Sequence, residues 1–235
     1  MREERGAGEV WSVIRELTLP VLRTLPWRAL AAGSGLGLLL AGLLRLYGDS
    51  LTGWSALTLL RTAALAHALG LTFLLDDPAR HTTAAAPTRR PLRTGLRVAL
   101  VTPVTVLWWT AVVLLVPSDL RPPVGPVTLE AGAACALALA AGALAIRLTD
   151  EPRPGPSVAA ALLFTAVVGP LLLPARWALF VFPQDKRWEA SHERWGVVLA
   201  AAVLVWAACL GEPVRRRRLR SGPASSGAGR FTADA

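Results

Sequence analysis

Residues 54–75 read WSALTLLRTAALAHALGLTFLL, an apolar segment that contains two ionisable side chains, Arg61 and His67. A helix needs about 20 apolar residues to cross the roughly 30 Å hydrocarbon core of a bilayer. Further apolar segments of comparable length occupy 29–46, 98–116, 127–146, 157–174 and 197–211. The sequence therefore predicts an all-α, polytopic membrane protein with six transmembrane helices.

The composition of the chain fits a membrane protein. Of its 235 residues, 53% are hydrophobic and 17% are charged, with a net charge of +9. The basic residues flank apolar segments and do not share a soluble basic face with aromatic stacking residues, so no nucleic acid is expected as a partner. Contacts with membrane lipids are the expected role of these charges.

Lysine and arginine are distributed unequally between the connections. The N-terminal arm, the second and fourth loops and the C-terminal tail contain 5, 5, 2 and 6 of them. The first, third and fifth loops contain 0, 1 and 4. Because positive residues are retained in the cytoplasm, both termini are expected there. The arginine-rich composition, with abundant Ala, Gly and Pro, indicates a bacterial plasma membrane.

Three regions are predicted along the chain: a cytoplasmic arm at 1–28, a six-helix domain at 29–211 and a basic, disordered tail at 212–235. In the arm, apolar residues recur at helical spacing within 9–19, which predicts an amphipathic helix in the cytoplasmic membrane interface. A soluble surface helix packed on another protein is the alternative.

The fifth loop is long and mixes apolar with charged residues. Irregular backbone at membrane depth requires cover from protein or water. A partly inserted, re-entrant hairpin is therefore possible at 170–196, around Pro174 and Pro183. An interfacial aromatic turn with Trp188 and Trp195 is expected to follow it.

Two groups of small side chains are interpreted as packing residues. Gly33 and Gly37 form a GxxxG pair, which lets helix backbones approach closely in lipid. Cys135 and Cys209 lie in apolar segments without CxxC spacing, so a metal or disulfide role is not expected.

The motifs of several enzyme classes are missing. The sequence contains no GxxxxGK[ST], HExxH or GxSxG pattern. The pair Asp76–Asp77 resembles part of an Asp-rich metal site, but no second acidic cluster accompanies it. We expect no catalytic residue, no metal and no cofactor in this chain, and hence no enzyme activity.

Three ionisable residues lie in or near the spans: Arg61, His67 and Glu130. Charged groups in a bilayer are costly and usually face a cavity or a partner. The depths of Arg61 and Glu130 permit an ion pair or a shared polar lining. His67 lies nearer the midplane, where a hydrogen-bonded histidine in helix packing and a proton relay or ligand site are the alternatives.

The layout resembles the permease subunit of a six-span, type-two ABC exporter of actinobacterial kind. The resemblance rests on an interfacial N-terminal helix, six spans with internal termini, a basic loop after span two and a long external segment before span six. It implies a homo- or heterodimer with a second permease, and separate ATPase subunits that bind ATP. It also implies a docking region for the ATPase that contains Asp76, Asp77, Arg80, Arg89, Arg90 and Arg93.

Two other classes of protein stay open at this stage. The first is a non-transporting membrane scaffold or accessory protein, because six spans do not by themselves imply a transport path. The second is a membrane enzyme. The sequence selects no substrate among drugs, peptides and lipids.

Overall fold

The computed structural model of the protein describes residues 21–76, 90–149 and 153–210. Within these ranges the regular elements are long helices and short 3₁₀ turns, without a strand. The helices are α2 (Trp27–Leu46), α3 (Gly53–Leu71), α4 (Arg90–Leu115), α5 (Val124–Leu148), α6 (Gly155–Leu172) and α7 (Trp188–Leu210). All six are long and apolar enough to cross a membrane, which confirms the all-α, polytopic prediction. The predicted helix at 9–19 and the tail at 212–235 lie outside the described residues.

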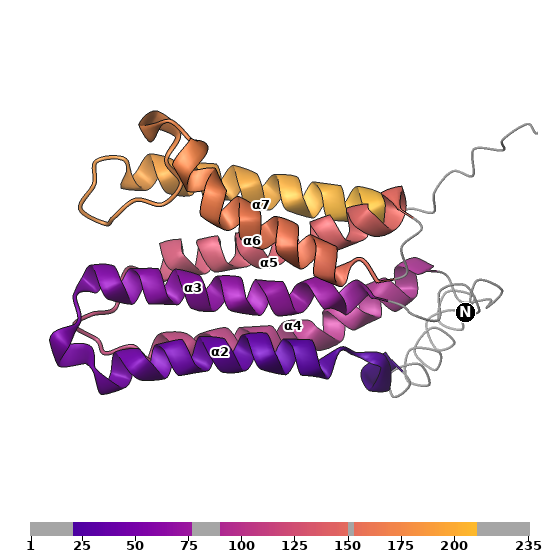
Figure 1. The fold of residues 1–235 in the computed structure, drawn as a ribbon, viewed down its shortest axis with the longest axis horizontal. Coiled ribbons are helices and arrows are strands. Elements are labelled where there is room, and N and C mark those ends of the chain that lie inside the picture. Colours follow the sequence, from indigo (N-terminus) through magenta and orange to yellow (C-terminus); the bar gives the residue numbers. More distant parts are fainter. Residues whose placement is uncertain (1–20, 77–89, 150–152, 211–235) are drawn as a thin grey trace, which may run out of the picture.

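The helices run alternately up and down in one bundle (Figure 1). The connections 47–52, 116–123 and 173–187 lie at one end, on the left of the view. The start of α2 and the end of α7 lie at the opposite end. Both ends of the six-span region thus lie on one side, as predicted, while the assignment of that side to the cytoplasm stays a prediction.

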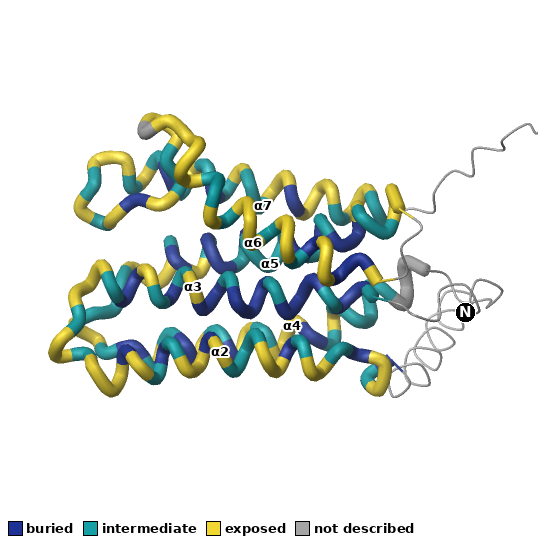
Figure 2. The backbone as a smooth tube through the Cα atoms, in the orientation of Figure 1, coloured by how far each residue is buried: buried dark blue, intermediate teal, exposed yellow. Residues whose placement is uncertain are grey.

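Helix α3 is the central helix of the bundle. It is buried over 61% of its apolar window, against 22% for α2 and 11% for both α6 and α7 (Figure 2). Its Leu57 and Leu60 are almost inaccessible and share a core cluster with Ala41 of α2 and Val112 of α4. A 3₁₀ turn, Thr72–Leu75, continues α3. Groups on α3 are therefore placed between the other helices and away from lipid.

The backbones of α2 and α3 approach closely where small residues face each other. A side chain at Gly33 would press against the carbonyl oxygen of Ala66, and one at Gly70 would lie 2.8 Å from the carbonyl oxygen of Ala29. A side chain at Gly37 would meet the ring of Trp108. The GxxxG pair therefore serves packing within the chain, where small residues allow van der Waals contact between helices.

Helix α4 begins at Arg90 instead of 98, and the last helix also begins earlier than the sequence predicted. It starts at Trp188 instead of 197, so Trp188 and Trp195 lie within α7, and the predicted aromatic turn is wrong. The start of the helix was predicted too late because this stretch contains polar residues and therefore lacks the apolar pattern of a span. Glu189 and Glu193 are exposed, whereas Ser191 and Trp195 face inward, which is an amphipathic pattern. Before α7, residues 173–187 form irregular chain with one 3₁₀ turn, Ala175–Trp177; the insertion of a hairpin here stays a prediction.

Helix α6 is a loosely packed span with the fewest buried residues. Of its side chains only Val158 is buried, and Gly155 is buried at its start. Phe164, Leu171 and Leu172 are mostly exposed. Because lipid tails are as apolar as leucine, this exposure is expected on a bilayer-facing helix. It also means that few side chains hold α6 in place.

Candidate functional site

Arg61 of α3 and Glu130 of α5 form a bidentate ion pair. The Arg61 Nε donates to Glu130 Oε2 at 2.6 Å, and Nη2 donates to Oε1 at 2.7 Å. The two side chains are 14% and 5% exposed. This fork geometry is the strongest arrangement of such a pair, and its burial explains why both charges are tolerated inside the bundle. The structure thus brings together two residues that the sequence placed at compatible depths.

The connection before α7 covers this pair through its backbone carbonyls. The Arg61 Nη2 also donates to the carbonyl oxygen of Val181 at 3.1 Å, and the Arg61 guanidinium lies 5.3 Å from the centre of the Phe180 ring. The carbonyl oxygen of Leu179 accepts hydrogen bonds from Ser191 Oγ and from Trp195 Nε1. These bonds fix the segment 178–182 over the start of α7 and above α3.

His192 of α7 is a third ionisable group at the pair, and the sequence analysis missed it. Its Nδ1 lies 2.8 Å from the carbonyl oxygen of Trp188, and its Nε2 lies 3.1 Å from Glu130 Oε1. The second distance suits an ion pair, but the direction does not meet hydrogen-bond geometry, and Nε2 has no hydrogen-bond partner among the described residues. The spacing of Trp188, His192 and Trp195, at positions i, i+4 and i+7, was the available signal.

A cavity of about 800 Å³ lies beside the ion pair, between α3, α5, α6, α7 and the segment 178–182. Arg61 and Glu130 contribute to its wall, and most of the remaining lining is aliphatic or aromatic. The hydroxyls of Thr58, Thr62 and Thr165 in the lining each donate to a carbonyl four residues earlier in their own helix. The cavity therefore offers an apolar volume with one charged wall.

A second polar group joins α2, α3 and α4 around His67. The His67 Nδ1 lies 3.0 Å from Ser34 Oγ, and Nε2 lies 3.1 Å from Thr105 Oγ1. The Trp108 ring stacks on the imidazole at 4.1 Å and donates from Nε1 to the Ser34 carbonyl oxygen. Both ring nitrogens of His67 thus have partners, and its side chain is buried. This arrangement is a packed interhelical network.

Among the predicted docking residues, the structure describes the side chain of Asp76 alone. Asp76 Oδ1 accepts a hydrogen bond from the Gly155 amide at 2.9 Å, at the start of α6. The Arg97 Nη1 of α4 donates to the carbonyl oxygens of Leu74 and Asp76. Asp76 therefore joins the end of α3 to the start of α6. Asp77, Arg80 and Arg89, and the side chains of Arg90 and Arg93, lie outside the described residues.

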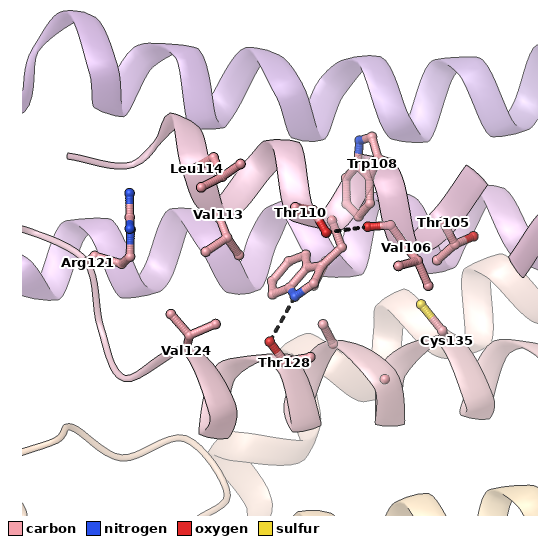
Figure 3. A pocket seen from close by; sticks show the side chains of 14 residues that line it. Thr105, Val106, Trp108, Thr110, Val113, Leu114, Arg121, Val124, Thr128 and Cys135 are labelled. Carbon is pink, nitrogen blue, oxygen red and sulfur yellow. Dashed lines mark hydrogen bonds between the residues drawn. The ribbon is translucent and has the colours of Figure 1, made fainter. Parts of the chain in front are cut away.

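A second, smaller groove lies between α4 and α5, with a volume of about 560 Å³ (Figure 3). The Trp109 Nε1 of α4 donates to the Thr128 hydroxyl of α5 at 3.0 Å across it. Arg121 lies at one end of the groove and Cys135 at the other. The groove shares Ala64 and Ala131 with the first cavity and otherwise has its own lining.

Comparison with known proteins gives no relative for this chain. No protein family, no curated protein and no solved structure matches it. Among the described residues, no group of three His, Cys, Asp or Glu side chains is arranged to hold a metal. The six spans identify an integral membrane protein, and its function has to be argued from the cavity, the ion pair and the attachment of α6.

Proposed function

We propose that the chain is the membrane-spanning permease subunit of an ATP-driven exporter and works with separate ATPase subunits. What supports the proposal is the cavity beside Arg61 and Glu130, bounded on one side by the loosely packed α6. A volume of about 300–1,000 Å³ with few polar groups is typical of sites for small molecules. Such a cavity within a bundle of spans suits an apolar or amphiphilic substrate.

The attachment of α6 supplies a way to move the cavity wall. Asp76 is the first residue of the basic loop that the sequence predicted at 76–97, and it binds the amide at the start of α6. A partner that displaces this loop would act on α6 through Asp76. Helix α3 would stay in place, since it is the most buried span and is fixed to α5 by the bidentate pair. The cavity would then change shape through α6 while α3 and α5 keep their spacing.

In this proposal ATP binding and hydrolysis supply the energy. The coupling to the spans comes from differential contact with the ATPase in two states, because a ligand shifts a conformational equilibrium only by its difference in affinity. Asp77, Arg80, Arg89, Arg90 and Arg93 are the proposed docking residues beyond Asp76. A second permease, identical or different, completes the complex.

The test is co-purification of the tagged chain with candidate ATPases, followed by ATP turnover in lipid. Reversal of charge at Arg89, Arg90 and Arg93 should weaken the complex and lower turnover. The matched control reverses Arg45, an exposed arginine at the opposite end of the bundle, and should leave both unchanged. Asp76→Ala should lower turnover more than it weakens assembly, because the other docking residues remain while the contact with the Gly155 amide of α6 is lost.

Unchanged assembly and turnover in the triple variant would refute the docking role. If no ATPase assembles with the wild-type chain, the non-transporting scaffold or accessory protein becomes the better description. In that case Arg61 and Glu130 would serve to hold α3 and α5 together, and the cavity would be filled by lipid.

A further inference from the structure

Arg121 is a cation with few partners, in the connection between α4 and α5. Its Nη2 donates to the carbonyl oxygen of Val116 at 2.8 Å. Its Nε is buried and has no hydrogen-bond partner in the part of the chain that the structure describes. Within the same residues Arg121 takes part in none of the ion pairs. A guanidinium has five N–H donors, so most of its capacity for an anion is unused.

The groove at Arg121 is apolar along its length. From Arg121 it continues past Val113 and Val106 of α4, and Cys135 lies near its far end (Figure 3). The polar atoms along this path are occupied: Trp109 Nε1 donates to Thr128, and the Thr110 hydroxyl donates to the Val106 carbonyl oxygen. The groove thus has one cationic end and an apolar remainder.

The position of the groove matches the depth profile of a lipid. Helix α4 ends at Leu115 and α5 begins at Val124, so Arg121 lies beyond the ends of both spans, where lipid phosphates are found. At 1.5 Å per residue, Cys135 lies roughly 16 Å along α5 from its start, about half the hydrocarbon core. An acyl chain that starts at Arg121 has room to extend within one leaflet.

We propose that this groove binds one phospholipid, whose phosphodiester lies on Arg121 and whose acyl chain lies between α4 and α5. The phosphodiester supplies the anion and the acceptors that the guanidinium lacks, and arginine binds such oxygens well. The proposal does not depend on transport, because it concerns a groove that the proposed ATPase mechanism does not use.

The test compares two photoreactive lipids with the purified chain in nanodiscs. One is a phosphatidylglycerol with a diazirine in its acyl chain, and the other is a diacylglycerol with the same chain. We expect the phospholipid to label peptides containing Val106 or Cys135 about tenfold more than the diacylglycerol does. Tenfold corresponds to about 1.4 kcal/mol of binding free energy. The exposed Leu204 of α7 is the reference position and should be labelled equally by both probes.

Two kinds of variant test separately how the charge of Arg121 and the open volume of the groove contribute to lipid binding. Arg121→Gln should remove the preference for the phospholipid, and Arg121→Lys should keep part of it. Gly132 lines the groove, and a Cβ atom there would have no neighbour within 4 Å, so Gly132→Trp should place an indole in the groove and abolish its labelling. Gly125→Trp is the matched control on α5, since Gly125 also faces open space but does not line the groove.

Three results would overturn the proposal. Equal labelling of the groove by the two probes in the wild-type chain would mean that the lipid phosphate does not contribute to binding. Labelling that survives Gly132→Trp would place the lipid elsewhere. An unlabelled groove, combined with a change of oligomeric mass on Gly132→Trp, would assign the groove to a second copy of the chain. Failure of the ATPase complex leaves each of these measurements unaffected, so the two proposals fail separately.

Discussion

Arg61 places a positively charged side chain in the otherwise mostly apolar wall of the cavity. Its guanidinium has a carboxylate of α5, and a carbonyl oxygen and an aromatic ring of the segment 178–182, as neighbours. A buried charge of this kind is tolerated when it is paired and hydrogen-bonded. The pair therefore does more to fix where α3, α5 and the segment 178–182 lie than to add net stability.

Loss of one partner of the pair should cost more than loss of both. Glu130→Met would leave the Arg61 cation unpaired inside the bundle, at a cost of about 3–5 kcal/mol. The double variant Arg61→Met/Glu130→Met should lose less than Glu130→Met alone. Thermal unfolding of the detergent-solubilised protein measures both changes, with the exposed Arg45→Met as a control that should shift little. Additive losses in this cycle would contradict the energetic pairing.

Asp185 should respond to pH through its neighbour Arg187. Hydrogen bonds from the Arg187 side chain and backbone lower the pKa of Asp185 from 3.8 to about 2. Because the folded-state pKa is the lower one, the contacts act fully above pH 3.8 and are lost as pH falls through about 2. A carboxyl ¹³C titration should show this midpoint, and Arg187→Gln should raise it toward 3.8.

A second arginine of the same connection serves as the control for Arg187→Gln in this titration. Arg176 is an exposed arginine of the same connection, and Arg176→Gln should leave the midpoint of Asp185 near 2. A shift of equal size in both variants would mean that the general positive charge of the loop, and not the specific hydrogen bonds of Arg187, lowers the pKa.

Among the helices, the contact between α2 and α3 depends on glycine backbone. A methyl group at Gly70 would lie 2.8 Å from the Ala29 carbonyl oxygen, and backbone cannot move aside as a side chain can. Gly70→Ala should therefore destabilise the protein by about 1–3 kcal/mol in thermal unfolding. Gly35→Ala on α2, where nothing lies within 4 Å, should stabilise it by about 0.5–1 kcal/mol. Equal effects would contradict the close approach.

The spans were predictable because apolar length is a local property of the sequence. Helix α4 begins at Arg90 instead of 98, but the spans of α2, α3, α5 and α6 were located within a few residues of their observed bounds. The start of α7 was not, because its first turns carry charged side chains whose inward partners, such as Ser191 with Leu179, are set by tertiary contacts. For the same reason compatible depths for Arg61 and Glu130 could be predicted, but the contact of His192 with Glu130 and the bond between Asp76 and Gly155 could not.

For the protein as a whole, the arrangement of the connections bears on its orientation. The positive-inside rule predicts that the end with the connections 47–52, 116–123 and 173–187 faces outward. The basic residues of 173–187 and early α7 are the exception to the rule. Two of them fold back on the structure: Arg187 pairs with Asp185, and Arg194 donates to the Ala178 carbonyl oxygen and lies over the Trp177 ring. Because these two arginines already have partners within the protein, fewer unpaired positive charges at this end conflict with the predicted orientation.

This orientation predicts which engineered cysteines a membrane-impermeant maleimide reaches in intact cells. In a Cys135→Ala/Cys209→Ala background, Ser118→Cys at the end with three connections should be labelled without permeabilisation. Arg153→Cys, exposed before α6 at the other end, should be labelled only after the membrane is opened. The two positions are both exposed, so a difference between them reports the side of the membrane and not burial. The reverse pattern would place both termini outside, and the predicted docking residues would then have no access to an ATPase in the cytoplasm.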